Sequence, residues 1–261
     1  MSSDRYLLDN ARTEAGERFA AMAELFDPWT VGHLEAAGVR PGARVWEVGA
    51  GWPSVPAWLA ERVGPSGHVV APDVDTSWLD ADAGYDVLRH DVTAEPPPGE
   101  GFDVVHARLV LVHLPDRVRV LDSLVGSLAS GGVLVIEDAD PALQPLACLV
   151  EDSPEAALAN RVRQGFRSLL AERGADLAFG RTLPVRLRAA GLVDVRAEVF
   201  TPYGGTALRT LEVATIGHVR DRLVGAGIAT EAEIDHLVDH LRDGGLDLTP
   251  APLVSAWGRR P

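Results

Sequence analysis

The chain has 261 residues, 46% hydrophobic and 24% charged, which is ordinary for a folded globular protein. Its formal net charge of −14 repels phosphate backbones and anionic lipid surfaces, so neither a nucleic-acid nor a membrane partner is expected. All 24 basic residues are arginine, which excludes every mechanism that needs a lysine nucleophile, a lysine base or a Walker-A lysine.

The single cysteine, Cys148, allows no internal disulfide, and its apolar neighbours predict a buried, inert thiol. No stretch approaches the ~20 apolar residues of a membrane span. Residues 1–6 also lack the charged and then apolar design of a signal peptide. These features together predict a cytoplasmic protein.

Apolar spacing predicts two N-terminal helices, at about 13–26 and 30–37, with a break at Asp27-Pro28. The segments that follow alternate between apolar runs and amphipathic stretches. Strands are predicted at 44–48, 67–73, 85–90, 102–107 and 133–136, and helices at 53–63 and 115–129. This alternation is typical of a parallel, doubly wound sheet.

The second half is less regular but continues the pattern. Further helices are predicted at 153–172, 182–190, 207–225 and 230–242, and further strands at 193–200 and 253–258. We therefore predict an α/β fold with a Rossmann-like, doubly wound, seven-stranded sheet in a single domain, 1–261. Its parts are N-terminal helices at 1–37, a core at 40–140, and helical additions at 141–190 and 201–252 that form a cap.

The most informative segment follows the first strand. The strand ends at Glu47 and Val48, and the chain then turns through glycines at Gly49 and Gly51. Such a turn after an apolar strand forms the ligand crevice of open α/β sheets. Position 54 is Ser, so the G-x-G-x-x-G pattern of dinucleotide sites is broken, and a nicotinamide-dependent reductase is the weakest functional option.

Acidic residues recur where the predicted parallel strands end. They are Glu47, Asp73, Asp91 and the pair Glu137-Asp138. Because the carboxyl ends of parallel strands meet at one edge of the sheet, these acids should line one crevice. Carboxylates accept hydrogen bonds from ribose hydroxyls and amino groups and tolerate a nearby cation, but they suit a free phosphate badly.

Several further segments carry a family pattern in the same order along the chain. They are Glu47-Val48-Gly49-Ala50-Gly51, Asp73, His90-Asp91-Val92, Phe102-Asp103-Val104-Val105-His106-Ala107-Arg108, His113-Leu114-Pro115 and Gly131-Gly132-Val133-Leu134. In this succession the sequence resembles the class I S-adenosylmethionine (SAM)-dependent methyltransferases, over roughly 40–140 and more loosely to the C-terminus. It looks most like bacterial enzymes that methylate small molecules, often in specialised metabolism.

The resemblance implies SAM as cofactor and assigns residues to it. The implied cofactor-binding residues are Glu47, Gly49, Ala50, Gly51, Asp73, Val74, Asp91, Val92 and Arg108. Asp73 would bind the ribose diol, with Asp75 as the alternative if the strand register is shifted. Asp91 and the Val92 backbone would address adenine, and Arg108 would pair with the SAM carboxylate or, alternatively, form a surface ion pair.

Residues 52 and 53 depart from the family, in which small residues and often a third glycine occur. Here they are Trp52 and Pro53, and proline has no N–H to donate to a ligand. Trp52 either packs under the fold or projects into the methionine pocket. In the second case the SAM site would be weakened or repurposed.

The catalytic base is open. His106 and His113 flank the exit of the fourth predicted strand, and Glu137 and Asp138 end the fifth. His106, His113 and Asp138 are our catalytic candidates. No metal site is predicted: His236 and His240 have ligand spacing, but no third ligand is apparent.

Three functions remain open at this point. The first is methyl transfer from SAM to an O, N or C nucleophile of a small organic molecule, whose pocket would come from residues 1–37, 141–180 and 201–250. The second is a repurposed methyltransferase fold that binds SAM, its product S-adenosylhomocysteine (SAH) or another ligand, and catalyses a different reaction or none. The third is an interaction module whose helical additions form a homodimer.

Overall fold

The computed structural model describes residue 7, residues 13–80 and residues 82–261. Residues 1–6 and 8–12 of the predicted N-terminal helical part lie outside this description. The chain divides into two compact units. We call residues 27–139, 178–200 and 253–261 the sheet unit, and residues 1–26, 140–177 and 201–252 the helical unit. That the chain forms a single domain, 1–261, stays a prediction.

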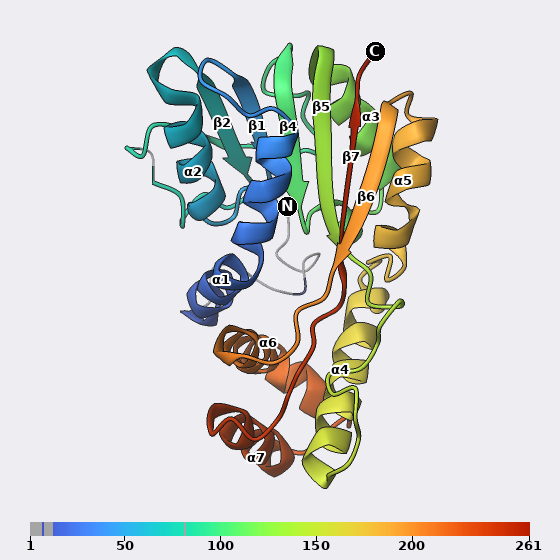
Figure 1. The fold of residues 1–261 in the computed structure, drawn as a ribbon. Coiled ribbons are helices and arrows are strands. Elements are labelled where there is room, and N and C mark those ends of the chain that lie inside the picture. The colour runs from blue at the N-terminus through green and yellow to red at the C-terminus, as the bar shows by residue number, and fades with distance from the viewer. Residues whose placement is uncertain (1–6, 8–12, 81) are drawn as a thin grey trace. The chain divides into compact units, whose positions relative to one another are not determined.

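The sheet unit holds seven strands in the order β3-β2-β1-β4-β5-β7-β6 (Figure 1). The strands are β1 (Arg44–Val48), β2 (His68–Asp73), β3 (Asp86–Arg89), β4 (Phe102–Arg108), β5 (Leu128–Ala139), β6 (Val193–Phe200) and β7 (Leu253–Arg259). The helices are α2 (Ser54–Val63), η2 (Gly64–Ser66), η3 (Leu111–His113), α3 (Arg117–Ser127) and α5 (Phe179–Ala189). The predicted seven-stranded Rossmann-like sheet is confirmed.

The sheet is mixed, not wholly parallel as the alternating pattern suggested. β7 pairs antiparallel with both of its neighbours, β5 and β6. A strand that runs parallel to the previous one needs a crossover connection, whereas an antiparallel strand does not. The chain returns to the sheet after the insertion between β6 and β7 without a crossover, so β7 runs antiparallel. Of the helices that the structure describes, none is long and apolar enough to cross a membrane.

The break predicted at Asp27-Pro28 is wrong. One helix, α1 (Thr13–Ala36), runs through Pro28. Proline removes one hydrogen bond from a helix interior and disfavours its continuation. Here the turn around it is held from outside, because Asp27 and Thr30 both bind Arg108 of β4. Tertiary contacts have overridden the local signal.

Residues 130–132, which lie between the helix predicted at 115–129 and the strand predicted at 133–136, belong to β5. The strand shifts its pairing with β4 between Phe102 and Val104, which accommodates the glycines. At Gly132 a Cβ would lie 2.7 Å from the backbone oxygen of Phe102. The glycine is therefore needed because β4 and β5 approach closely there.

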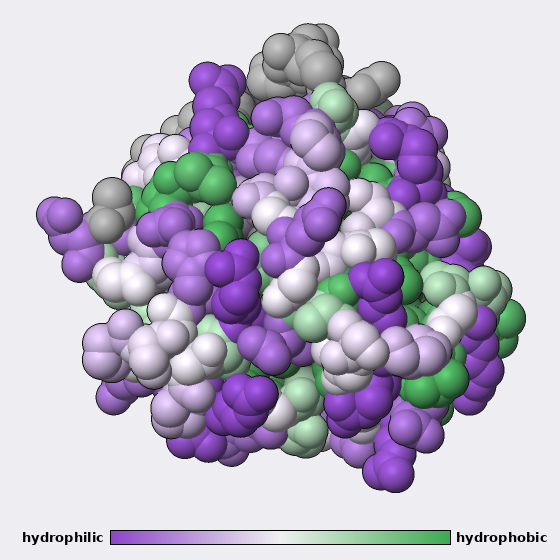
Figure 2. Space-filling model, turned by 90° about the horizontal axis from the view of Figure 1, so that it is seen from above, coloured by the Kyte–Doolittle hydropathy of each residue, from purple (hydrophilic) through white to green (hydrophobic). Residues whose placement is uncertain are grey.

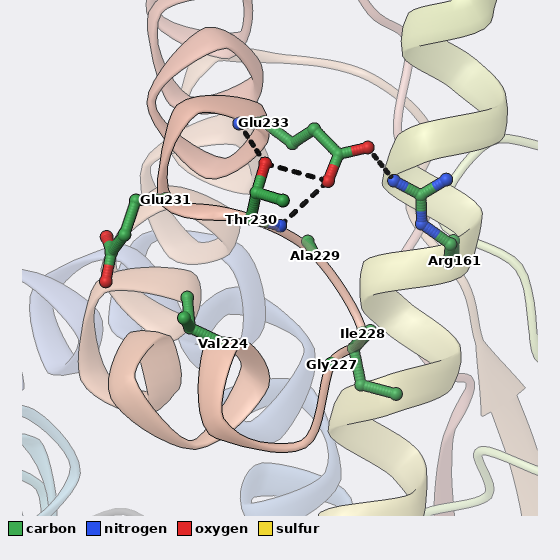
Figure 3. A pocket seen from close by; sticks show the side chains of 8 residues that line it. All are labelled: Arg161, Val224, Gly227, Ile228, Ala229, Thr230, Glu231 and Glu233. Carbon is green, nitrogen blue, oxygen red and sulfur yellow. Dashed lines mark hydrogen bonds and ion pairs between the residues drawn. The ribbon is translucent and has the colours of Figure 1, made fainter.

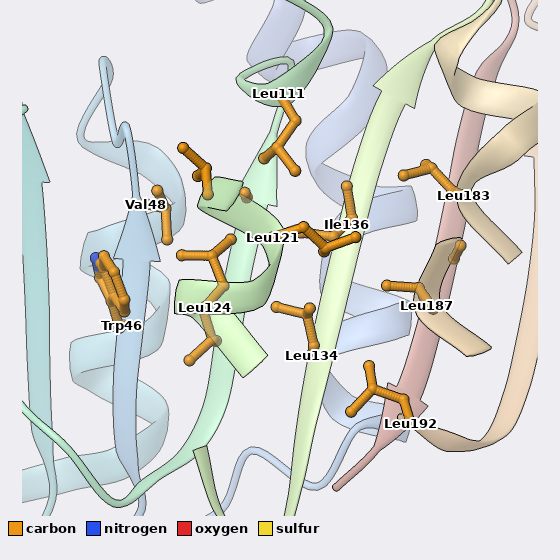
Figure 4. Close-up of a cluster of buried hydrophobic side chains, with 14 of the residues drawn as sticks. Trp46, Val48, Leu111, Leu121, Leu124, Leu134, Ile136, Leu183, Leu187 and Leu192 are labelled. Atoms are coloured by element: carbon orange, nitrogen blue, oxygen red, sulfur yellow. The ribbon is translucent and has the colours of Figure 1, made fainter. Parts of the chain in front are cut away.

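Apolar side chains cover both faces of this sheet. On one face, residues of β1 and β5 pack with α3 and α5, as Figure 4 shows for Trp46, Ile136, Leu121 and Leu187. Each such buried side chain contributes about 1.5–3 kcal/mol. Because strand side chains alternate between faces, Glu47, between Trp46 and Val48, points to the opposite face. The face of the molecule drawn in Figure 2 is mostly hydrophilic, with hydrophobic residues in small separate groups.

The helical unit is built from α4 (Pro154–Glu172), α6 (Thr206–Gly225) and α7 (Glu231–Arg242). The three helices share an apolar core that includes Val162, Leu223 and Leu237. α4 begins with the Ser153 side chain accepting from Ala156 N, and α7 begins with a capping box formed by Thr230 and Glu233. The predicted helical additions are thus present and have a core of their own.

Cys148 belongs to this core and is buried. Burial, and then the negative charge of Glu212, raise the pKa of its thiol to about 11. The thiol is therefore protonated at neutral pH, in agreement with the predicted inert cysteine.

A buried ion pair crosses the helical unit. Arg163 Nη2 lies 2.6 Å from Glu212 Oε2, and its Nη1 donates to the backbone oxygen of Thr249 at 3.2 Å. Replacing Arg163 with methionine should lower the free energy of unfolding by about 2 kcal/mol, because Glu212 loses its partner. Chemical denaturation measures this. The double replacement R163M/E212L should recover most of the loss, and a double variant as unstable as the single one would contradict the interpretation.

Candidate functional site

The glycine turn connects β1 to α2 at the edge where the parallel strands end. Gly49 and Gly51 have φ angles of 60° and 58°, a conformation that L residues rarely adopt. A Cβ on Gly49 would lie 2.8 Å from Val110 Cγ2. The turn therefore requires glycine at position 49 for its backbone angle and for the space beside Val110.

The N–H groups of this turn are used inside the protein. Ala50 N donates to the backbone oxygen of Pro72 at 3.2 Å, Gly51 N to Asp73 Oδ2 at 2.9 Å, and Trp52 N to the backbone oxygen of Ala50 at 2.5 Å. Pro53 has no N–H. The turn from 50 to 53 therefore offers no backbone donors to a phosphate, unlike a dinucleotide-binding loop.

Asp73 ends β2 beside this turn and is 8% exposed. One carboxylate oxygen accepts from Gly51 N and the other from Asp75 N, each at 2.9 Å. Burial raises the pKa of Asp73, and the backbone N–H groups of Asp75 and Gly51 partly offset this. Each oxygen keeps acceptor capacity for a further donor. Val74 follows with 58% of its surface exposed, which leaves an apolar side chain at this edge uncovered.

The other acids near β2 and β3 have local roles as well. Asp75 Oδ1 accepts from Ser77 N at 3.0 Å, so Asp75 caps its own loop. Asp91 accepts from the N–H and the hydroxyl of Thr93 through Oδ1. Val92 is half-buried against the sheet core. Asp91 Oδ2 has no hydrogen bond in the described part of the chain and is the oxygen available to a ligand.

A buried histidine lies between two acids on the face of the sheet opposite Trp46. His106 of β4 is 0% exposed. Its Nδ1 is 2.6 Å from Glu47 Oε2, and its Nε2 is 3.4 Å from Glu137 Oε2. Burial alone would lower the pKa of His106, but the charge of Glu47 and the hydrogen bonds to both acids raise it to about 9. His106 is therefore an imidazolium at neutral pH.

Glu137 is the centre of a larger network. It accepts from Thr30 Oγ1 at 2.5 Å and Ser255 Oγ at 2.7 Å, and it lies 3.0 Å from His33 Nδ1. Burial would raise its pKa, but the hydrogen bonds from His106, His33 and Thr30 outweigh burial and hold the pKa far below its ordinary value. Glu137 thus stays ionised and connects α1, β4, β5 and β7.

Arg108 extends the network at the end of β4. Its Nη1 donates to Asp27 Oδ1 at 2.8 Å and to Thr30 Oγ1 at 3.0 Å. This is a partly buried ion pair, and the pairing of Arg108 with the SAM carboxylate stays a prediction. Arg108 Nε and Nη2 have no hydrogen-bond partner among the described residues, so they can bind a second acidic group.

The three catalytic candidates have different surroundings. His106 is buried between acids, as described above. Asp138 is also 0% exposed and lies beside the N–H groups of Leu111 and Val112, on the face opposite Glu137. Burial raises the pKa of Asp138 well above its ordinary range, in spite of those N–H groups. His113, at the end of η3, is half-buried and is the candidate that solvent reaches.

Sequence reasoning missed Thr30, His33 and Ser255 as members of this network. Neither Thr30 nor His33 carries a motif, and both lie on a helix that the sequence pattern divided at Asp27-Pro28. In a continuous 13–36 helix, His33 lies one turn beyond Trp29 and Thr30 and so shares a face with them. That spacing is the signal from which these residues could have been grouped. Trp29 Nε1 donates to Ser255 Oγ at 2.9 Å, and its ring stacks on Phe200.

The helical unit also has a hollow on its surface, between α4 and the α6–α7 loop (Figure 3). Its lining residues are Arg161, Val224, Gly227, Ile228, Ala229, Thr230, Glu231 and Glu233. Glu233 is held by Arg161 at 2.5 Å and by the N-cap Thr230, so these polar groups are used by one another. We assign no ligand to this hollow.

No group of three or more His, Cys, Asp or Glu that could hold a metal occurs among the residues that the structure describes. His236 Nε2 instead lies 3.1 Å from Glu155 Oε1, and its ring stacks on that of His240.

Residues 46–136 match the model of the methyltransferase domain family. This segment is similar to methyltransferase domains. It carries the glycine turn, Asp73, Asp91 and the β4 exit, which are the parts on which the predicted resemblance depended. The predicted resemblance to the class I methyltransferases, whose cofactor is SAM, is therefore confirmed over this segment.

Two curated relatives are similar to this chain over part of their length. The ubiquinone/menaquinone biosynthesis C-methyltransferase of Vibrio parahaemolyticus is 33% identical over 132 residues, 46% of this chain and 50% of the relative. Methyltransferase str2 of Strobilurus tenacellus is 34% identical over 158 residues, 56% of this chain and 52% of the relative. The chain spans about half the length of these relatives.

Solved structures agree in fold. A phosphoethanolamine N-methyltransferase 2 of Haemonchus contortus, in complex with phosphomonomethylethanolamine and SAH, has a TM-score of 0.61 at 17% identity, covering 100% of this chain and 61% of the other. A putative sarcosine dimethylglycine methyltransferase of Galdieria sulphuraria has a TM-score of 0.53 at 13% identity, covering 90% and 84%.

Replacing Gly49 with alanine should lower the free energy of unfolding by about 2–3 kcal/mol, from the left-handed backbone and from the contact with Val110. Gly101 is the matched control, since its φ is 71° and nothing lies within 4 Å of a Cβ there. Its alanine variant should lose only the backbone part, about 1–2 kcal/mol. Equal losses in urea denaturation would show that the space beside Val110 is unimportant.

Proposed function

We propose that the protein transfers the methyl group of SAM to an O, N or C nucleophile of a small organic molecule. This proposal rests on one observation about the turn at 50–53. Its backbone N–H groups donate to atoms of the protein, whereas Asp73 and Asp91 have carboxylate oxygens that can accept further hydrogen bonds. That set suits hydroxyl, amino and cationic groups and repels phosphate. It therefore fits SAM and not a dinucleotide.

Different residues would then bind different parts of the cofactor. Asp73 would accept hydrogen bonds from the ribose hydroxyls, and Asp91 Oδ2 from the adenine amino group. Arg108 would hold the methionine carboxylate through the nitrogens that Asp27 does not use. When bound, SAM supplies a methyl group on a positively charged sulfur, which is already a good electrophile. The protein mainly has to position the reactants and exclude water.

The acceptor is the finer part of the proposal. His106 cannot accept a proton while it is an imidazolium, and Asp138 is buried on the opposite face. His113 is then our proposed base, where one is needed. A single histidine base suits an acceptor that is readily deprotonated, such as a phenol or hydroquinone ring. The name of the Vibrio relative, a quinone C-methyltransferase, points to the same class of acceptor. A role in specialised metabolism remains a prediction.

A labelled-methyl assay tests this proposal. The protein is incubated with methyl-labelled SAM and a panel of hydroquinones, phenols and small amines, and the extracted products are counted. Transfer to a ring acceptor, reduced in His113→Asn, is expected. SAH binding without transfer to any acceptor would favour the repurposed-fold alternative. A homodimer also remains a proposal, and mass measured in solution tests it.

A further inference from the structure

Trp52, where the turn departs from the family pattern, packs against a second tryptophan. The ring centroids of Trp52 and Trp78 are 5.5 Å apart, with the planes tilted by 45°. Both side chains are half-buried. Trp78 follows Asp73 by five residues, in the loop after β2. The pair therefore joins the exit of β1 to the exit of β2.

The strand order decides which way Trp52 turns. β2 and β4 lie on opposite sides of β1. A ring in contact with the loop after β2 is directed toward Asp73 and away from the β4 exit, where Arg108 lies. Trp52 therefore does not occupy the side proposed for the methionine end. The structure therefore gives no reason to expect that Trp52 closes the methionine pocket.

The same segment provides aromatic surface in place of backbone donors. Trp52 N is bound to Ala50, and Pro53 has none. Residues 52 and 78 instead carry two indole rings, one on the residue after Gly51, whose N–H binds Asp73, and one five residues after Asp73 itself. A nucleobase gains about 1–3 kcal/mol by stacking on an aromatic side chain. An adenosyl group held by Asp73 has such a surface within reach.

We propose that Trp52 and Trp78 form an aromatic wall against which the adenosine half of the cofactor packs, so that Trp52 is a binding residue and not an obstruction. The proposal rests on the proposed function, since it needs SAM and SAH as ligands. It predicts the direction in which a substitution of Trp52 changes the affinity for SAM and SAH: loss of the ring weakens binding.

The test is calorimetric titration of the full chain with SAH and with adenosine, accompanied by tryptophan fluorescence. The variants are Trp52→Leu, Trp78→Leu and Trp52→Phe, and the control is Trp58→Phe on α2, which packs against the apolar core. Both leucine variants should bind SAH and adenosine about 5- to 100-fold more weakly. They should also lose most of the fluorescence change on SAH addition. Trp52→Phe and Trp58→Phe should stay within about threefold of the natural protein.

Unchanged or tighter SAH binding by Trp52→Leu would overturn the proposal, and tighter binding would show that Trp52 obstructs the site. Circular dichroism and thermal melts check that each variant is folded. If one leucine variant fails to fold, the other leucine variant and the fluorescence change of the natural protein on SAH addition still decide. Absence of any fluorescence change would contradict the wall. If the natural protein binds no SAH, the proposed function itself fails, an outcome distinct from equal binding by all variants.

Discussion

Asp73→Asn is expected to weaken SAH binding by about 100-fold. The side chain keeps its shape but loses its charge, and its NH₂ group must face either Gly51 N–H or Asp75 N–H, which are both donors. Two hydrogen bonds to a charged group, at about 1.5 kcal/mol each, correspond to this loss. Isothermal titration of the natural protein and the variant measures it directly.

Asp75→Asn is the matched control, two residues along the same loop. Asp75 accepts from Ser77 N, and an asparagine oxygen can do the same. Its SAH affinity should therefore stay within about threefold of the natural value. Loss of affinity in Asp75→Asn and not in Asp73→Asn would mean that the ribose is bound by Asp75, the alternative that the sequence left open.

His106→Gln is expected to lower the free energy of unfolding by about 3–5 kcal/mol at pH 7, because it leaves two buried carboxylates without their shared cation. His236→Gln is the control, since His236 also pairs with a glutamate but has 60% of its side chain exposed. Its effect should stay below about 0.5 kcal/mol. Equal, small losses in both variants would show that the buried network contributes little.

The dependence on pH has a definite sign. Below the ordinary histidine pKa of 6.5, His106 is protonated in both folded and unfolded chains, and its full stabilisation is present. Between 6.5 and about 9 only the folded chain keeps the proton, so stability falls by about 1.4 kcal/mol per pH unit, about 3 kcal/mol in all. The stability difference between the natural protein and His106→Gln should therefore shrink as pH rises from 6 to 9. A constant difference would contradict a charged His106.

Much of the sheet unit was predictable because its signals are local. A strand that ends in Glu47 and turns through Gly49 needs backbone angles and space that only glycine allows, and the sequence shows this directly. The acids at 73 and 91 follow from the same strand-end rule. These residues lie where the family pattern placed them, and their ligand roles remain proposals.

The network around Glu137 could not be predicted in the same way. Its partners come from residues 30, 33, 106 and 255, which only the folded sheet brings together. The local helix-breaking tendency of Pro28 also concealed the continuity of α1. The antiparallel β7 was concealed for a related reason: a short apolar strand has the same periodicity in either direction.

Calorimetric titration of the natural protein with SAH, SAM and NADH, each in a separate experiment, tests the central claim most directly. We predict micromolar binding of SAH and SAM and no binding of NADH. The reason is that the N–H groups of the turn donate within the protein and that carboxylates line this edge of the sheet. Binding of NADH, or of none of the three, would contradict the assignment of this edge of the sheet to SAM.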